Sequence, residues 1–103
     1  MKYTARYFIE KFEKIPDEMW NLHTYGSVDG PKCALGHCRS WPEQTRPVSF
    51  PTPESNALDE MLSMCTIEIS DGRKDAYQLG DTPKERILNA LMLVEAGVWK
   101  EIV

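Results

Sequence analysis

The sequence is short of the features that several large protein classes need. No apolar run approaches the ~20 residues that a helix needs to cross a bilayer. Residues 1–6 lead into charged sequence instead of the apolar core of a secretion signal. With 12 Lys and Arg against 16 Asp and Glu, the net charge is -4, so the chain lacks the basic surface that holds phosphate backbones. We therefore predict a cytoplasmic protein that binds neither membranes nor nucleic acid.

Cysteine and histidine are scarce as well. The chain has three cysteines, at positions 33, 38 and 65, and two histidines. An odd number of cysteines is not the disulfide framework of a small secreted domain, so reduced thiols are expected. The 103 residues contain no internal repeat and fit one domain of ordinary size, which we place at 1–103.

Apolar residues recur at helical spacing in three segments. Thr4, Thr52 and Thr82 are suited to cap their first turns, and Gly97 is suited to end the last segment. Pro83 and the Thr-Pro-Lys-Glu capping box make the last segment the clearest of the three. The predicted helices cover residues 4–14, residues 53–64, and residues from 82 to the stop at Gly97, after which Trp99 is expected to pack back.

The rest of the chain predicts shorter elements. Residues 66–70, Thr-Ile-Glu-Ile-Ser, are β-branched and alternating, and Asp71-Gly72 follows as a turn, so we expect a strand that residues 76–79 could pair with. Four prolines between 41 and 53 indicate an extended connector. We also expect a helical turn at 16–20, a loop or weak hairpin at 25–30, and a short helix or buried turn at 33–38. The predicted fold class is α+β, with three main helices and a small sheet.

Cys33, His37 and Cys38 form the densest group of reactive side chains. As metal ligands, Cys33 and His37 would lie about 40° apart around a helix, but Cys38 lies about 100° beyond His37. Zinc prefers four tetrahedral nitrogen or sulfur donors, often from Cys-x-x-Cys pairs, and the chain has no such pair. His23 or Cys65 would have to complete the set.

Two other interpretations of this group remain open. Cys33 follows a Gly-Pro turn and could act as a nucleophile at a helix N-terminus, with His23 or His37 as its base. Alternatively, the apolar run Cys33-Ala34-Leu35-Gly36 packs in the core, where free cysteine is common.

The aromatic residues suggest a surface for contacts. Trp20, Trp41 and Phe50 flank the cysteine segment, near Arg39 and Arg46, and such a mixture could anchor a partner protein or stack a base. Tryptophan in a small domain is more often core, which we favour for Trp20 and Trp99 while Trp41 stays open.

Four short motifs stand at residues 15–20, 32–38, 69–72 and 82–91. Taken in this order, they resemble a family of small uncharacterised bacterial and phage proteins. In that family a Trp turn precedes Cys-Ala-Leu-Gly, an Asn-Asp or Asn-Asp-Gly turn comes later, and an amphipathic helix closes the chain. The resemblance singles out Cys33, Gly36, His37, Asp71 and Gly72, and the chain has Ser70 where the family pattern has Asn.

Together these observations favour a small cytoplasmic accessory or interaction protein of bacterial or phage origin. We expect it to use no cofactor and to meet a protein partner near Trp20 and Trp41. The alternatives are a Cys33-dependent enzyme, with His23, His37 or Asp71 as further candidate residues, and a structural zinc domain. Convergence of these side chains in one pocket would distinguish a site from a core.

Overall fold

The architecture is helical. A computed structural model describes residues 3–22, 24–42 and 48–100, and within them the extended pairing is limited to isolated bridges. The expected α+β class with a small sheet is therefore wrong. The α-helices are α1 (Ala5–Glu13), α2 (Pro53–Met61), α3 (Thr66–Asp71) and α4 (Pro83–Glu95), and the 3-10 helices are η1 (Asp17–Met19), η2 (Gly36–Cys38) and η3 (Lys74–Leu79).

The predicted strand at 66–70 is helix α3. Its buried residues are Thr66, Ile69 and Ser70, which share one helical face, while Ile67 on another face is 41% exposed. Gly72 ends the helix in the left-handed conformation, with φ of +70°. The Asp-Gly pair thus supplies a helix stop instead of a hairpin turn. The second expected strand, at 76–79, lies in η3.

The three predicted main helices are confirmed, and so are their capping threonines. The capping box predicted at residues 82–85 is only half formed, because the Glu85 carboxylate accepts from the backbone N–H of Asp81 instead of that of Thr82. The hydroxyls of Thr4, Thr52 and Thr82 accept hydrogen bonds from the backbone N–H of the residue three positions later. Each bond satisfies one of the N–H groups that a helix start leaves without a partner. Helix α2 ends at Met61, three residues before its predicted end, and Gly97 follows α4 with φ of +76°.

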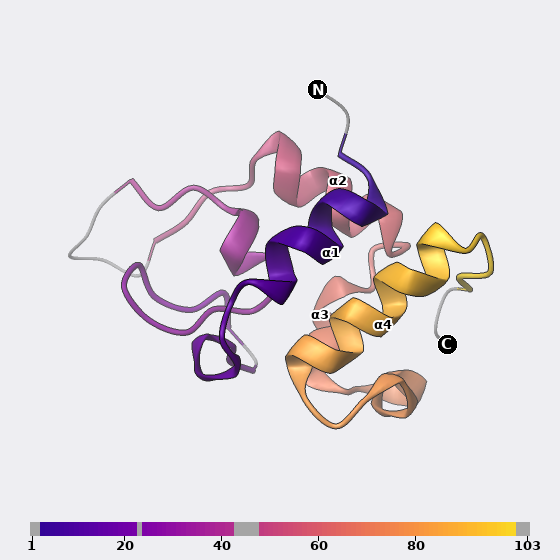
Figure 1. Ribbon diagram of the computed structural model, residues 1–103. Helices are drawn as coiled ribbons and strands as arrows, with labels where there is room; N and C mark the ends of the chain where they lie inside the picture. Colours follow the sequence, from indigo (N-terminus) through magenta and orange to yellow (C-terminus); the bar gives the residue numbers. More distant parts are fainter. Residues whose placement is uncertain (1–2, 23, 43–47, 101–103) are drawn as a thin grey trace.

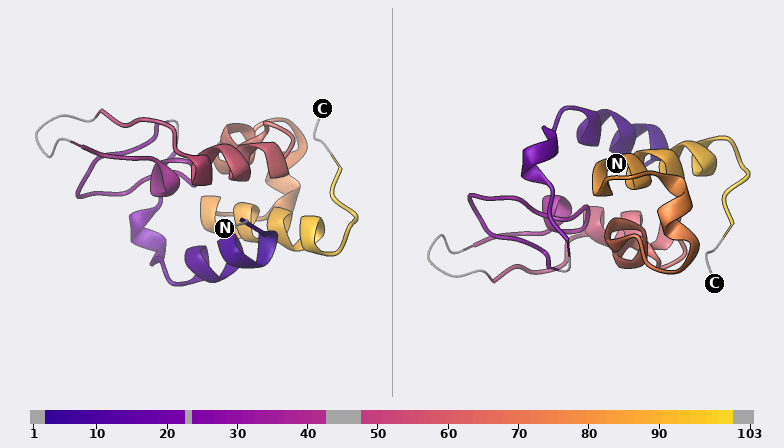
Figure 2. Two further views of the ribbon diagram at one scale, coloured as in Figure 1. Left: turned by 90° about the horizontal axis from the view of Figure 1, so that it is seen from above. Right: turned by 90° about the horizontal axis from the view of Figure 1, so that it is seen from below.

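The helices form two layers around one apolar core. In both views of Figure 2, α1 and α4 lie in one layer and α2 and α3 in the other. Helix α4 packs against both α1 and α3. Side chains with no exposed surface come from every layer: Phe8, Ile9, Phe12, Leu58, Leu62, Ile69, Ile87 and Leu91. Trp99 packs back against this core, and its indole N–H donates to Ser63 Oγ at 3.1 Å, as expected.

The described residues between η1 and α2 form an irregular lobe beside the helices (Figure 1). Isolated bridges pair Lys32 with Trp20 and with Gly26, and the ends of the proline-rich connector are joined where Ser40 and Phe50 exchange two backbone hydrogen bonds of 2.9 Å. Residues 43–47 of that connector lie outside the described residues. No helix in the described part of the chain has the length and apolar character to cross a membrane.

Candidate functional site

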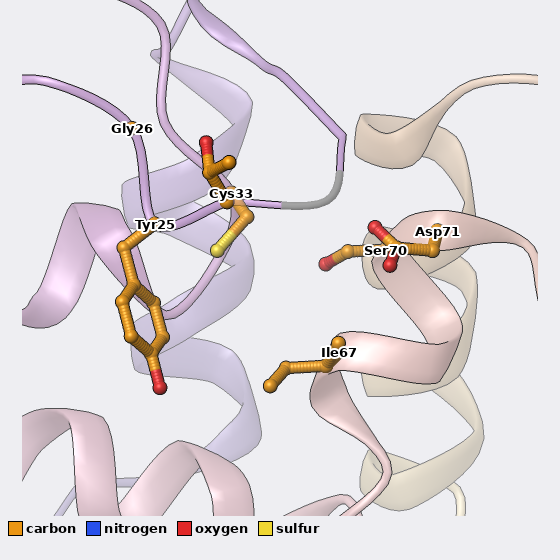
Figure 3. A pocket seen from close by; sticks show the side chains of 7 residues that line it. Tyr25, Gly26, Cys33, Ile67, Ser70 and Asp71 are labelled. Atoms are coloured by element: carbon orange, nitrogen blue, oxygen red, sulfur yellow. The ribbon is translucent and has the colours of Figure 1, made fainter.

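A pocket of about 510 Å³ opens between the irregular lobe and α3. Its volume lies in the range of small-molecule sites, roughly 300–1,000 Å³. In Figure 3, Ile67, Ser70 and Asp71 extend from α3 toward the loop that carries Tyr25 and Cys33. The lining residues are Thr24, Tyr25, Gly26, Cys33, Ile67, Ser70 and Asp71.

The pocket has a buried polar floor and an exposed rim, to which Thr24 contributes a polar side chain and Tyr25 and Ile67 contribute apolar surface. Cys33 is 5% exposed, Ser70 is 1% exposed, and the side chain of Asp71 is 2% exposed. Tyr25 and Ile67, by contrast, are 37% and 41% exposed. A ligand entering the pocket would pass apolar side chains before it reaches a thiol, a hydroxyl and a carboxylate.

The Cys-Ala-Leu-Gly turn positions the loop side of the pocket. A Cβ on Gly36 would stand 1.9 Å from the carbonyl oxygen of Tyr25, so only glycine permits this backbone contact. The backbone N–H of Gly36 also donates to Cys33 Sγ at 3.5 Å. Arg39 stacks its guanidinium 4.0 Å from the centroid of the Tyr25 ring. One turn therefore fixes both Tyr25 and Cys33.

Arg86 of α4 positions the helix side of the pocket. Its guanidinium donates to the carbonyl oxygens of Ile69 at 2.8 Å, Ser70 at 2.7 Å and Gly80 at 3.2 Å. Burial lowers the pKa of Arg86, and the nearby Asp71 carboxylate acts in the opposite direction. The carbonyls at a helix C-terminus carry partial negative charge, so the cation stabilises the end of α3. Ser70 and Asp71 are held in place as a result.

Ser70 is the most informative residue of the floor. Its Oγ is buried and has no hydrogen-bond partner among the described residues. Leaving a buried hydroxyl unsatisfied costs roughly 1–3 kcal/mol. Because Ser70 lines the pocket, a water or a ligand inside the pocket could satisfy it.

Two of the four predicted catalytic candidates, Cys33 and Asp71, meet in this pocket. Burial is the main cause that raises the pKa of the Cys33 thiol, and the negative charge of Asp71 adds to the rise. Asp71 itself is approached by Arg73 at 3.3 Å. The surroundings of Cys33 therefore favour the neutral thiol over the thiolate that a nucleophile needs.

The structure describes one of the other two candidates, and it does not share the pocket with Cys33. His37 lies outside the pocket lining: its ring packs edge-on against Trp20, and its Nε2–H donates to the carbonyl of Met19 at 2.9 Å. Burial lowers the pKa of His37 to about 4, so the imidazole is neutral at pH 7. His23 lies outside the described residues.

The candidate metal ligands Cys33, His37 and Cys38 are not gathered around one point. Among the described residues, no three His, Cys, Asp or Glu side chains are placed to hold a metal ion. Cys38 is 3% exposed, and burial raises its pKa to about 12. The thiols of Cys33, Cys38 and Cys65 are buried and form no disulfide, as is typical of reduced cysteines that pack in a core.

The two tryptophans expected at a partner surface differ in burial. Trp20 is 8% exposed and belongs to the core, where it packs edge-on against Phe12. Trp41 is half-buried, with its indole N–H donating to the Gly36 carbonyl at 2.9 Å. Trp20 therefore has little surface to offer a partner, and Trp41 has more.

Comparison with known proteins adds no assignment to this geometry. The chain matches no protein-family model, no curated protein and no solved structure. The resemblance to small bacterial and phage proteins stays a prediction, and the function has to be argued from the pocket itself.

Sequence reasoning missed several residues that build the site. Tyr25 and Ile67 carry no motif, because a loop aromatic and an exposed isoleucine are common. Ser70 was noted only as a departure from a family pattern. Arg86 did give a signal: it interrupts the apolar stripe of its helix beside the fully buried Ile87, and a buried arginine needs partners.

Proposed function

We propose that this protein is a small cytoplasmic accessory protein that acts by binding, and that the pocket between the irregular lobe and α3 is its recognition site. The observation that carries the proposal is the Ser70 hydroxyl, buried on the pocket floor with no partner among the described residues. Native proteins satisfy nearly all such groups, so an exception in a pocket points to something that binds there.

The rim supports recognition of a partly apolar ligand or side chain. Tyr25 and Ile67 expose apolar surface at the mouth of the pocket, and covering that surface on binding is favourable. Further exposed apolar residues, Leu22, Val48 and Phe50, lie in the same irregular lobe as Trp41. These side chains favour a protein partner that contacts the lobe.

A Cys33-dependent enzyme is the competing proposal, and its support is that Cys33 and Asp71 line one pocket. The raised pKa of Cys33 and the engagement of His37 with Met19 weigh against it. A general base for the thiol would need to lie within hydrogen-bond reach of the sulfur. Binding is the better-supported function.

A fragment titration of the full-length, ¹⁵N-labelled protein tests the binding function. We expect fragments to shift the amide signals of Thr24, Gly26, Cys33, Ser70 and Asp71 above all others. Ile67→Trp, which fills the mouth of the pocket, should weaken these fragments by at least about tenfold.

Met92→Trp is the matched control for that titration. Met92 is 45% exposed on α4 and does not line the pocket, so the same bulky residue there should leave fragment affinity unchanged. Failure of every fragment to shift the pocket signals, or equal loss in both variants, would refute the pocket as the recognition site.

A further inference from the structure

The hydrogen-bonding groups of the pocket floor favour a ligand that donates. The Asp71 carboxylate can only accept, and its two oxygens offer about four acceptor sites, so it can accept from a ligand beside its present partners, Arg73 among them. The Ser70 hydroxyl can both donate and accept. Cys33 Sγ already accepts from the Gly36 N–H and adds at most a weak donor. Acceptor capacity therefore dominates the floor.

The charge of the lining disfavours an anionic ligand. Among the described residues that line the pocket, Asp71 is the one charged side chain. The nearest buried cation, Arg86, is not a lining residue, and its Nε, NH1 and NH2 groups donate to backbone carbonyls. Arg73 has a side chain that is 58% exposed, where solvent screens its charge. An anionic head group would therefore meet the Asp71 carboxylate, and none of the described lining residues is a cation that could bind the head group.

The rim sets the shape of the rest of the ligand. Figure 3 shows the Tyr25 ring and the Ile67 side chain on opposite sides of the space below Cys33 and Ser70. Arg39 stacks on the Tyr25 ring and restrains it. An aromatic ring or short apolar stem would lie between these two side chains, with its polar end toward Ser70 and Asp71.

We infer that the pocket binds a ligand whose head is a planar, non-anionic NH₂-bearing group, an amide or an amidine, attached to a flat apolar body. Its N–H groups donate to the Asp71 carboxylate, and an amide carbonyl accepts from the Ser70 hydroxyl. This inference rests on the proposed binding function and specifies its ligand.

Three probes of the same shape test the head group. Benzamide, benzamidine and benzoate differ in charge and in N–H donors but share one flat ring. Titrated into the ¹⁵N-labelled full chain, benzamide and benzamidine should shift the pocket signals and bind at least about tenfold more tightly than benzoate. Benzoate binding as tightly as benzamide would overturn the inference.

Replacing the Asp71 carboxylate with an amide should shift the preference of the pocket from benzamidine toward benzoate. Asp71→Asn introduces an N–H donor at the floor, so we expect benzamidine to weaken by at least about tenfold and benzoate to gain affinity. Asp75→Asn removes the same charge from an exposed position outside the lining and should change neither. Ser70→Ala, a second variant that removes only the hydroxyl, should weaken benzamide more than benzamidine. Unchanged preferences in both Asp71→Asn and Ser70→Ala would contradict the assignment.

The same head chemistry can come from a free small molecule or from an arginine side chain of a partner protein. N-acetylarginine methylamide distinguishes the two sources. Affinity equal to or tighter than that of benzamidine identifies a partner's arginine, whereas binding at least about tenfold weaker identifies a free aromatic ligand.

Failure of the inference can be told from failure of the binding function. If other fragments shift the pocket signals but neither benzamide nor benzamidine does, the head-group assignment is wrong and the pocket remains a binding site. If no fragment of any kind shifts those signals, the binding function itself is wrong.

Discussion

At the scale of single residues, the surroundings of Cys33 decide its chemistry. The thiol is buried and shares the pocket with Asp71, and both raise its pKa above the ordinary value of 9.0. Iodoacetamide should therefore alkylate Cys33 more slowly than it alkylates free cysteine at pH 7.5, and the alkylation rate should still rise with pH where that of free cysteine has levelled off. Peptide mapping by mass spectrometry separates Cys33 from Cys38 and Cys65. Fast alkylation below pH 7 would instead favour the Cys33-dependent enzyme.

His37 gives the fold a dependence on pH. Its folded pKa is lowered from 6.5 to about 4, so the unfolded chain binds a proton more readily than the folded chain between these values. Stability is fully present above about pH 6.5 and falls as pH drops toward 4, by up to ~2–3 kcal/mol from this residue.

Urea unfolding at pH 7, 5.5 and 4.5 measures the contribution of His37. His37→Gln, which cannot take up the proton, should be less stable at pH 7 but lose less stability on acidification than the wild type. A variant whose pH dependence matches the wild type would show that His37 is not the titrating group.

Gly36 belongs to the Cys-Ala-Leu-Gly motif and also permits the close backbone contact that positions Tyr25 in the pocket. Its Cβ position lies 1.9 Å from the Tyr25 carbonyl oxygen, so Gly36→Ala must push the two segments apart. We expect a loss of ~2–3 kcal/mol or more in the free energy of unfolding, by analogy with overpacking in cores. At Gly97 an added Cβ meets open space, so the only cost of Gly97→Ala is the left-handed backbone conformation. This variant should lose ~1 kcal/mol of unfolding free energy. Equal losses in thermal or urea unfolding would contradict this role for Gly36.

At the scale of elements, α3 shows why its secondary structure could not be predicted from the sequence. Alternation of β-branched residues over five positions predicts a strand, but so short a run does not separate strand from helix. Two groups decide that the segment is a helix: one also fits a hairpin turn, and the other is distant in the sequence. Gly72 supplies a left-handed stop, and Arg86, 16 residues after Ser70, binds the last carbonyls. Long segments such as α1 and α4 could be predicted because their periodicity and caps are local.

Ile67 and Ile69 provide the matching test of α3. In a strand the two side chains would share a face and behave alike, but in α3 Ile69 is fully buried and Ile67 is 41% exposed. Ile69→Ala should lower the free energy of unfolding by ~2–4 kcal/mol, and Ile67→Ala by less than ~1 kcal/mol. Similar losses of unfolding free energy in urea denaturation would instead support a strand at these residues.

At the scale of the whole molecule, the site lies where the helical layers meet the irregular lobe. Sequence patterns singled out the Cys-Ala-Leu-Gly segment and the Asp71-Gly72 pair, but Asp71-Gly72 was predicted as a hairpin turn and instead ends helix α3. The pocket itself could not be predicted, because no local pattern shows that the lobe folds back over α3. Tyr25 and Ile67 lie 42 positions apart in the sequence, and tertiary packing alone brings them to one rim.

The fold should also be independent of metal. No group of three ligating side chains is gathered in the described part of the chain, and its cysteines contribute to the core instead. Thermal unfolding should be the same with and without EDTA, and elemental analysis should give well below one equivalent of zinc. A melting temperature that falls on chelation would revive the structural zinc interpretation.

The central claim is that the pocket between the lobe and α3 is a binding site for a planar NH₂-bearing head group. The most direct measurement is a crystal structure of the protein with benzamide. The expected result places the ring between Tyr25 and Ile67, with the amide nitrogen within hydrogen-bond distance of Asp71 and its oxygen near Ser70 Oγ. Benzamide bound elsewhere at saturating concentration, with this pocket holding only solvent, would contradict the claim.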